Sequence, residues 1–257
     1  MHVAVLTLFP ELFEPFLSTS LVGRAIDEGL LRVEVEDLRE HTEDRHRSVD
    51  DEPYGGGGGM VLTAQPLLSA IEALSGGFRK SPPRRILLSP QGRRLDEALV
   101  RELAECSGML LVCGRYEGVD ERVVEAAIDE EISIGDFVLS GGELPAMVLI
   151  EAISRQVPGV VGLGSSVERD SFREGLLDFP HYTRPREIAG RAVPEILLSG
   201  NHARIEAWRN KKSLEATLRK RPDLLRSAGL EAPDLDILAE LAEELDLELP
   251  AGLQGSG

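Results

Sequence analysis

Three glycine-containing polar segments each follow an apolar run in the middle of the chain, and this arrangement narrows what the chain can fold into. The segments are 89–92, 114–118 and 134–136, and the runs are 85–88, 109–113 and 131–134. Helical patterns separate the runs, so they predict buried parallel strands of an open α/β sheet. Ligands of such sheets bind outside the carboxyl ends of the strands. The three segments are therefore expected to converge on one pocket.

The residues of these segments favour a nucleoside as the ligand. Glycine lets the backbone approach a ligand closely, while Ser89, Tyr116, Glu117 and Asp136 add only a few side-chain hydrogen bonds. This suits a neutral or zwitterionic nucleoside better than a polyphosphate, and neither the dinucleotide fingerprint nor the P-loop motif is present. The five glycines at 55–59 follow an acidic stretch, so they indicate either a plain flexible turn or a loop with a function.

The pattern of elements predicts two domains joined by a linker. Strands are expected at 3–8, 32–37, 85–89, 109–113 and 131–134, and helices near 11–17, 19–29, 64–75, 95–105, 119–128 and 141–156. The glycine-rich, nearly chargeless stretch 159–166 has the composition of a linker. Helical patterns at 205–219 and 235–245 follow it. A large α/β domain and a small helical domain are expected.

Composition is consistent with a folded intracellular protein but does not by itself indicate a function. The 257 residues are 42% hydrophobic, enough for a core, and Cys106 and Cys113 are expected as buried free thiols that require no oxidising compartment. The apolar run at the N-terminus has no basic flank and ends at Pro10, which predicts a first strand and not a signal peptide. No stretch reaches about 20 apolar residues, so no membrane span is expected. These features predict a cytoplasmic location.

The net charge of the chain argues against a nucleic-acid partner, but the charges are unevenly distributed, and one segment is basic. A chain with a formal charge of −17 would repel a polyanion. Residues 171–221, however, contain eleven Lys and Arg against six Asp and Glu, whereas 231–248 contain eight carboxylates and no Lys or Arg. The basic segment indicates either a solvated helix face or a surface that contacts RNA.

Taken in order, these segments resemble the bacterial tRNA (guanine-N1)-methyltransferases, enzymes of the knotted SPOUT class. The resemblance is colinear over roughly residues 1 to 225 and rests on Leu6–Pro10, Asp51–Gly57, Leu88–Gly92, Cys113–Asp120, Ser133–Glu143, Glu168–Phe172, His181–Pro185 and Leu198–His202. Three positions depart from the family pattern: Gly58 replaces a common Pro, Leu87 a common aromatic residue and Phe137 a common Tyr. These departures bear on cofactor affinity and not on the reaction class.

The resemblance implies a fold that periodicity alone does not predict. It implies a SPOUT-type parallel sheet with a deep trefoil knot, formed by the segments around 89–140, plus a small all-helical C-terminal domain. The implied domains are a knotted S-adenosylmethionine-binding domain at 1–160, a flexible linker with the catalytic Asp at 161–175, a helical tRNA-binding domain at 176–248 and a tail at 249–257. It also implies a homodimer.

The implied reaction moves a methyl group from S-adenosylmethionine to N1 of guanosine 37, next to the tRNA anticodon. The resemblance assigns the following residues to the cofactor pocket: Leu88, Ser89, Pro90, Gly114, Tyr116, Glu117, Ser133, Ile134, Gly135, Asp136, Phe137, Val138, Leu139, Gly141, Gly142 and Pro145. Plainer interpretations remain for some of them. The paired glycines could simply start the following helix, and Glu117 could be a turn residue.

Guanine N1 bears a proton at neutral pH, so a base must remove it as the methyl group arrives, and the negative charge that develops on O6 needs a donor. The matching positions are Asp170 as general base and Arg155 as the cation that stabilises O6. Without the resemblance, an Asp after a Gly/Ser-rich stretch would be interpreted as solvated. The resemblance also implies Mg²⁺, but no carboxylate cluster in the sequence specifies a site for it.

Contacts with the anticodon stem-loop are expected in the C-terminal domain. The candidate residues are His181, Arg184, Asn201, Trp208, Lys211 and Lys212. The aromatic ring could stack on a base, and the cations could neutralise phosphates. Trp208 could equally belong to the core. A zinc site is not indicated, because no Cys or second His lies at the required spacing.

Two other classes remain open from the residues alone. A different nucleoside-binding α/β enzyme would explain the strand-end loops but not the C-terminal motifs, and failure to bind S-adenosylmethionine would favour it. A non-catalytic RNA-binding protein would explain the basic segment. Binding of tRNA without binding of the cofactor would favour that class.

Overall fold

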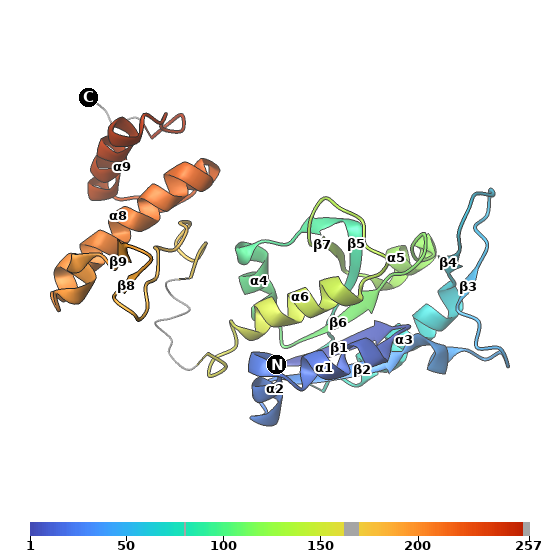
Figure 1. The fold of residues 1–257 in the computed structure, drawn as a ribbon. Coiled ribbons are helices and arrows are strands. Elements are labelled where there is room, and N and C mark those ends of the chain that lie inside the picture. The colour runs from blue at the N-terminus through green and yellow to red at the C-terminus, as the bar shows by residue number, and fades with distance from the viewer. Residues whose placement is uncertain (80, 162–169, 254–257) are drawn as a thin grey trace. The chain divides into compact units, whose positions relative to one another are not determined.

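The chain forms two compact units, Met1–Gly162 and Leu163–Gly257. The computed structural model describes residues 1–79, 81–161 and 170–253. Unit 1 contains a five-stranded sheet with helices on both faces, and unit 2 is mostly helical (Figure 1). The larger part of the expected linker, 162–169, lies outside the described residues.

The central sheet of unit 1 is entirely parallel. Its strands are β1 (His2–Thr7), β2 (Arg32–Asp37), β5 (Arg84–Arg94), β6 (Gly108–Cys113) and β7 (Glu130–Ser133), in the order β2-β1-β6-β5-β7. Each strand that periodicity predicts is present. Every residue of β6 is buried, as expected for a central strand whose two faces are both covered.

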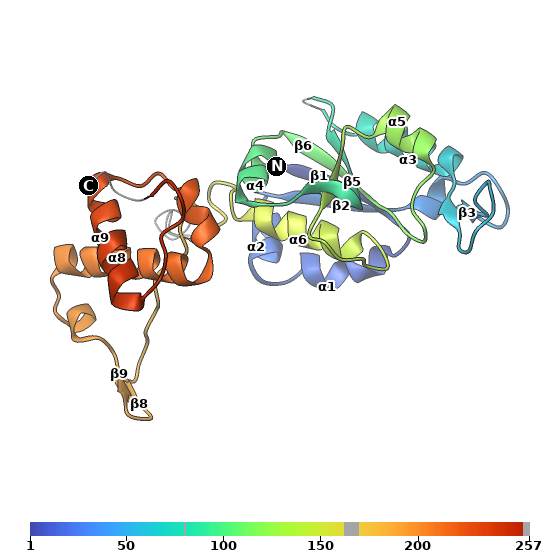
Figure 2. The same cartoon turned by 90° about the horizontal axis from the view of Figure 1, so that it is seen from above.

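Alternate residues of the central strands build two separate cores. In β1, Val3 and Val5 pack on one face, with α2 (Ser20–Asp27), α4 (Glu97–Ala104) and α6 (Glu143–Ser154). Ala4 and Leu6 pack on the other, with α3 (Ala64–Gly76) and α5 (Glu121–Ala127). Figure 2 shows these helices on opposite sides of the sheet. Because side chains alternate along a strand, one apolar run supplies both cores.

Strand β5 pairs with β7 in two stretches. Leu88 pairs in parallel with Ile132, and after a register shift Arg93 pairs with the same residue. The segment 89–92 therefore leaves the ladder after Leu88 and returns to β7 at Arg93. A Cβ on Gly92 would collide with the backbone of Glu131, so glycine allows this close approach to β7. The segment expected as a loop after a strand is therefore an excursion within β5.

The N-terminal segments of unit 1 are more broken than expected. The expected helix 11–17 is divided into a 3-10 turn, η1 (Pro10–Leu12), and the short α1 (Glu14–Leu17). The polar stretch 39–60 begins with η2 (Leu38–His41) and contains β3 (Asp50–Asp51), which pairs with β4 (Val61–Leu62). The five glycines lie in the hairpin loop between β3 and β4, which projects from the unit (Figure 1).

Unit 2 is built on two packed helices, α8 (His202–Lys220) and α9 (Ala232–Leu245), with 3-10 turns η3 (Glu195–Leu198) and η4 (Pro222–Arg226). Its buried core consists of Leu214, Leu218, Leu225, Leu238 and Leu241. The two helices agree with the expected patterns. The domain is not all-helical, however, because β8 (Glu187–Ile188) and β9 (Arg191–Ala192) form a small antiparallel hairpin. Across the described segments, no helix is both long and apolar enough to cross a membrane.

The close contact of Gly92 with β7 gives a test of the fold. Gly92→Ala is expected to lower the free energy of unfolding by about 1–3 kcal/mol, because the methyl group meets backbone that cannot move aside. Urea denaturation measures the change. Gly58→Ala is the matched control, since nothing lies within 4 Å of its added Cβ. Equal stability of the two variants would contradict the close contact.

Candidate functional site

A cavity of about 410 Å³ opens at the excursion of β5 and at the ends of β6 and β7, and all three predicted segments line it. Every residue expected to bind the cofactor lines this cavity except Asp136, which is exposed and lies outside it. Of the three departures from the family pattern, Leu87 and Phe137 line the cavity and Gly58 does not. The convergence of the three segments, expected from the order of the strands, is present in the structure.

The rim of the cavity exposes apolar surface. Phe137 is 53% exposed, Val138 83% and Leu139 37%, although side chains of this kind are usually buried. Tyr116, 51% exposed, has a φ of 60°, a left-handed conformation that a bulky residue rarely adopts. Strained backbone of this kind is concentrated at binding sites. The rim can therefore cover the apolar faces of a ligand ring, while backbone groups provide hydrogen bonds.

A buried ion pair lies at one wall of the cavity, with Arg115 in the cavity lining. The Arg115 Nε donates to both carboxylate oxygens of Glu143, at 3.2 and 3.0 Å, and its Nη2 lies 3.0 Å from Oε2. Glu143 is only 2% exposed and also accepts a hydrogen bond from the Thr7 hydroxyl at 2.8 Å. The Arg115 guanidinium lies 4.3 Å from the centre of the Phe9 ring. Each partner of the buried charge is thus satisfied.

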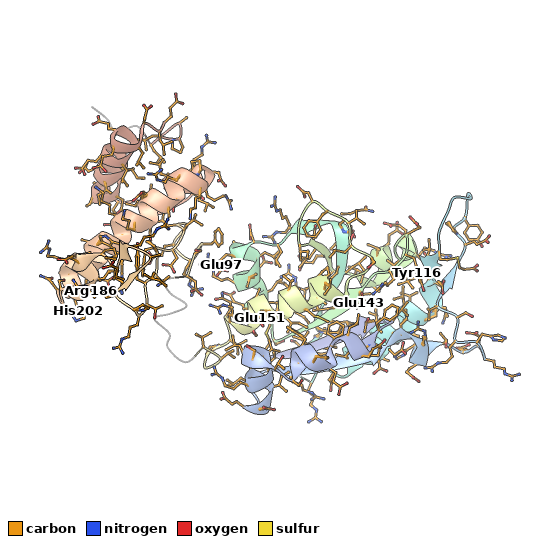
Figure 3. All side chains as sticks on the ribbon, in the orientation of Figure 1. Glu97, Tyr116, Glu143, Glu151, Arg186 and His202 are labelled. Atoms are coloured by element: carbon orange, nitrogen blue, oxygen red, sulfur yellow. The ribbon has the colours of Figure 1, made fainter. Side chains whose placement is uncertain are left out.

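This ion pair connects three elements of the fold. Thr7 ends β1, Arg115 follows β6, and Glu143 is the first residue of α6, marked in Figure 3 together with Tyr116. A carboxylate in the first turn of a helix is also favoured by the helix dipole. The pair therefore fixes the loop after β6 against the start of α6, and both border the cavity.

The two glycines before α6 allow this close approach. A Cβ on Gly141 would collide with the Arg115 and Glu143 side chains, and one on Gly142 would lie 2.7 Å from the Cys113 Cα. The Gly142 N–H donates to the Gly114 carbonyl at 2.9 Å. The glycines thus do more than start a helix, because the loop after β6 packs directly on their backbone.

The glycine hairpin also touches the cavity loop. The Glu117 N–H donates to the Met60 carbonyl at 3.0 Å, and the Leu62 N–H donates to the Gly118 carbonyl at 3.0 Å. A Cβ on Gly59 would collide with the Glu117 side chain. Backbone contacts thus place one end of the glycine run against Glu117, which lines the cavity.

Two titratable groups border the loop after β6. Burial raises the pKa of the Cys113 thiol well above its ordinary value, so this thiol is protonated and unreactive at neutral pH. At the other end, a hydrogen bond from the Arg122 side chain lowers the pKa of the Asp120 carboxyl to about 2. Asp120 also caps α5 by accepting from the Arg122 backbone N–H at 3.0 Å. Both groups are structural.

The two expected catalytic residues belong to different units. Arg155 is the half-buried C-cap residue of α6. Asp170 lies in unit 2, where it lines a second cavity of about 270 Å³ together with residues of α8 such as Glu206, Arg209 and Asn210. Asp170 therefore lies next to α8, in the lining of a shared cavity, and not in an isolated linker.

Several residues expected to contact RNA have structural partners in unit 2. Asn201 caps α8 by accepting from the Arg204 N–H at 3.2 Å, and His181 lies 2.8 Å from Asp178. The Trp208 ring is half-buried, 6.3 Å from the Tyr182 ring. It is not among the buried core residues of the unit, so the ring remains partly accessible.

The basic charge of α8 is partly balanced within the unit. Lys211 Nζ lies 3.5 Å from a carboxylate oxygen of Glu244, and Lys212 Nζ lies 2.6 Å from one of Glu215. Arg184 is exposed. These ion pairs are on the surface and are weak, so an RNA phosphate can compete for the same cations. In the part of the chain that the structure describes, no group of three or more His, Cys, Asp or Glu could hold a metal ion.

Comparisons with known proteins point to one family. The family model described as "tRNA (Guanine-1)-methyltransferase TrmD" matches residues 1–227. The tRNA (guanine-N(1)-)-methyltransferase of Chromohalobacter salexigens is 54% identical over 249 residues, 95% of this chain and 93% of the relative. That of Geobacter metallireducens is 51% identical over 244 residues, 95% of this chain and 98% of the relative.

The chain belongs to the tRNA (guanine-1)-methyltransferase family. The family and enzyme class expected from the sequence are thereby confirmed. A solved structure of a family member, the tRNA (m1G37) methyltransferase from Aquifex aeolicus, matches with a TM-score of 0.71 and 40% identity. The match covers 88% of this chain and 95% of that one.

The sequence did not lead us to predict the Arg115–Glu143 ion pair, although both residues lie in segments that resemble the methyltransferase family. Arg115 lies inside 113–120 and Glu143 ends 133–143, each next to glycines and apolar residues. A charged residue that is buried in such surroundings needs a partner of opposite charge. From this rule, an ion pair at each of these residues could have been predicted. The rule could not say which of the many opposite charges was the partner.

Removal of the Glu143 charge tests whether the Arg115–Glu143 ion pair stabilises the fold. Glu143→Gln keeps the side-chain volume but leaves the Arg115 guanidinium without its counter-ion, so the enzyme is expected to lose about 1–3 kcal/mol of unfolding free energy. Glu151→Gln, the other carboxylate of α6 and only half-buried, is the matched control (Figure 3). Denaturant titration compares the two. A Glu143 variant as stable as the control would contradict the role of the pair.

Proposed function

We propose that this enzyme transfers a methyl group from S-adenosylmethionine to N1 of guanosine 37, next to the tRNA anticodon. The observation that carries the proposal is the cavity at the β5 excursion and the ends of β6 and β7, lined by all the residues that the family resemblance assigns to the cofactor except Asp136. Family membership supports the reaction class. The name of the Aquifex aeolicus relative supports the position that is modified.

The cavity suits S-adenosylmethionine in size and chemistry. Its volume of about 410 Å³ lies within the usual range of small-molecule sites, roughly 300–1,000 Å³. Its apolar rim can hold the adenine, and the backbone of the glycine segments can read the edge of that ring. Glu117 supplies a carboxylate for the cationic methionine part. When bound, the cofactor supplies an electrophilic methyl group.

Asp170 and Arg155 are proposed to act on the guanine. A carboxylate at pH 7 is a weak base in water and becomes effective when solvent is excluded from it. Asp170 takes the proton from N1 as the new bond forms, and the Arg155 guanidinium donates to O6, where negative charge develops. Binding of Mg²⁺ is proposed from the family resemblance only.

The finer features of the fold are part of the same proposal. The return of β5 to β7 after the excursion 89–92 supports a trefoil knot within the domain 1–160. Exposed apolar residues on one unit, Val138 (83%), Leu144 (59%) and Val148 (46%), support a homodimer that covers them. The segment 161–175 is proposed as the linker, 176–248 as the tRNA-binding domain and 249–257 as a tail. A cytoplasmic location follows from the tRNA substrate.

The proposed RNA surface is α8 with the segment before it. His181, Arg184 and Asn201 precede or cap the helix, and Trp208, Lys211 and Lys212 lie on it. Lys and Arg contacts with phosphates supply much of the affinity for nucleic acid. The acidic helix α9 balances part of this charge in the free protein, through Glu244.

Cofactor binding can be tested at the crowded glycine. Gly141→Val is expected to abolish S-adenosylmethionine binding in calorimetry, because its side chain would displace the Arg115–Glu143 pair and close the cavity. Gly76→Ala, at the end of α3, has free space around the added methyl and should bind as the wild type does. Unchanged affinity in the Gly141 variant would place the cofactor elsewhere.

The reaction is tested by incubating the enzyme with labelled S-adenosylmethionine and unmodified tRNA and then mapping the methylated nucleotide. Asp170→Asn keeps the size of the side chain and removes the base. It is expected to leave both affinities within a few-fold and to lower single-turnover methyl transfer by about 10² or more. A rate near that of the wild type would remove Asp170 from the mechanism. Binding of tRNA without methylation would favour an RNA-binding protein.

A further inference from the structure

The chain from Asp170 to Asp178 is a self-closed loop. The Phe172 N–H donates to the Leu176 carbonyl at 2.7 Å, and the Arg173 N–H donates to the Asp170 carbonyl at 3.2 Å. Phe172 has a φ of 75°, which reverses the chain. These bonds make the backbone around Asp170 part of a compact turn. Whatever holds this loop therefore also determines where Asp170 lies.

Two contacts dock the loop on the helical core of unit 2. The hydroxyl of Thr217 accepts a hydrogen bond from the Leu177 N–H at 2.9 Å and donates to a carbonyl one turn earlier in α8 at 2.7 Å. A Cβ on Gly175 would lie 2.9 Å from the Ala228 Cα, so the two backbones are in direct contact. Leu176 packs against the core of the unit.

Thr217 is unusual among the polar residues of α8. It is 0% exposed, and its hydroxyl uses both its donor and an acceptor position in the two bonds described above. Replacement by an apolar residue would leave the Leu177 N–H without its partner in a buried place, which is costly. The loop would then move or loosen, and Asp170 with it.

The docked loop places Asp170 beside the helix that is proposed to bind RNA. Asp170 and the α8 residues Glu206, Arg209 and Asn210 line the same cavity of about 270 Å³. Trp208 lies between the first two of these helix residues in the sequence. The proposed base and the proposed RNA-binding helix are therefore parts of one packed body.

We infer that Thr217 is a positioning residue for methyl transfer. Through Leu177 and the loop 170–178 it fixes Asp170 relative to α8, so RNA bound on α8 meets a base that is already in place. The inference rests on the proposed function, in which Asp170 removes the guanine proton. It assigns a role in the reaction to a buried hydroxyl that touches no substrate.

The first experiment compares Thr217→Val with Thr217→Ser. The valine variant keeps the shape but loses the hydroxyl, and its single-turnover rate at saturating tRNA and S-adenosylmethionine should fall by about tenfold or more. Its dissociation constant for tRNA should stay within about two-fold of the wild type. The serine variant keeps the hydroxyl and should restore the rate. A valine variant with the wild-type rate would overturn the inference.

A second pair of variants tests the other docking contact and does not depend on how Thr217→Val folds. Gly175→Ala should slow the same step, because the added methyl pushes the loop off Ala228. Gly190→Ala is the matched control, since its φ of 73° resembles the 80° of Gly175 but nothing lies within 4 Å of its added Cβ. Equal rates for the two variants would contradict positioning by the docked loop.

A double-mutant cycle separates positioning from general damage to the unit. If Thr217 acts through Asp170, Thr217→Val should cause no further loss of rate in the Asp170→Asn background. An equal loss in both backgrounds, or weaker tRNA binding with a normal saturated rate, would overturn the inference. If Asp170→Asn lowers the single-turnover rate and Thr217→Val leaves it normal, the positioning role of Thr217 is refuted and the role of Asp170 as base stands. A normal rate for Asp170→Asn would refute the proposed base instead.

Discussion

The site depends on how β5 returns to β7 after leaving it. Ile132 pairs with both Leu88 and Arg93, and the chain between them touches the β7 backbone at Gly92. This places the excursion 89–92 directly against the end of β7, from which the third cavity segment begins. A strand that simply ended at Leu88 would leave the excursion without this second attachment. The return to β7 thus converts a loop into a fixed wall of the cavity.

The buried ion pair plays the corresponding role on the other wall. Arg115 and Glu143 come from different segments, and Thr7 adds a third. A charge this far from water is stable only while every partner is present. The same polar network therefore stabilises the fold and keeps the loop after β6 at the spacing that a ligand needs. Gly141 and Gly142 are constrained for the same reason, since side chains there would separate the partners.

Prediction from the sequence succeeded where local pattern and topology agree and was incomplete where distant segments meet. The continuous apolar runs of β1 and β6 require a sheet covered on both faces, and the order of strands and helices brings the three segments to one edge. Periodicity could not show that β5 resumes at Arg93, because this pairing depends on where β7 lies. The hairpin of β8 and β9 was missed because its strands have two residues each.

The sequence by itself determined the family, the parallel sheet, the division into an α/β part and a C-terminal helical part, and the segments that line the cavity. Apolar periodicity and glycine placement are local properties, so they can be read along the chain. Only the tertiary structure decided that Arg115 pairs with Glu143, that Gly92 packs against the backbone of β7 and that Thr217 holds the loop bearing Asp170. Each of these three contacts joins residues that are far apart in sequence. Many other residues of the chain have the same functional groups, and only the folded arrangement decides which of them becomes the partner.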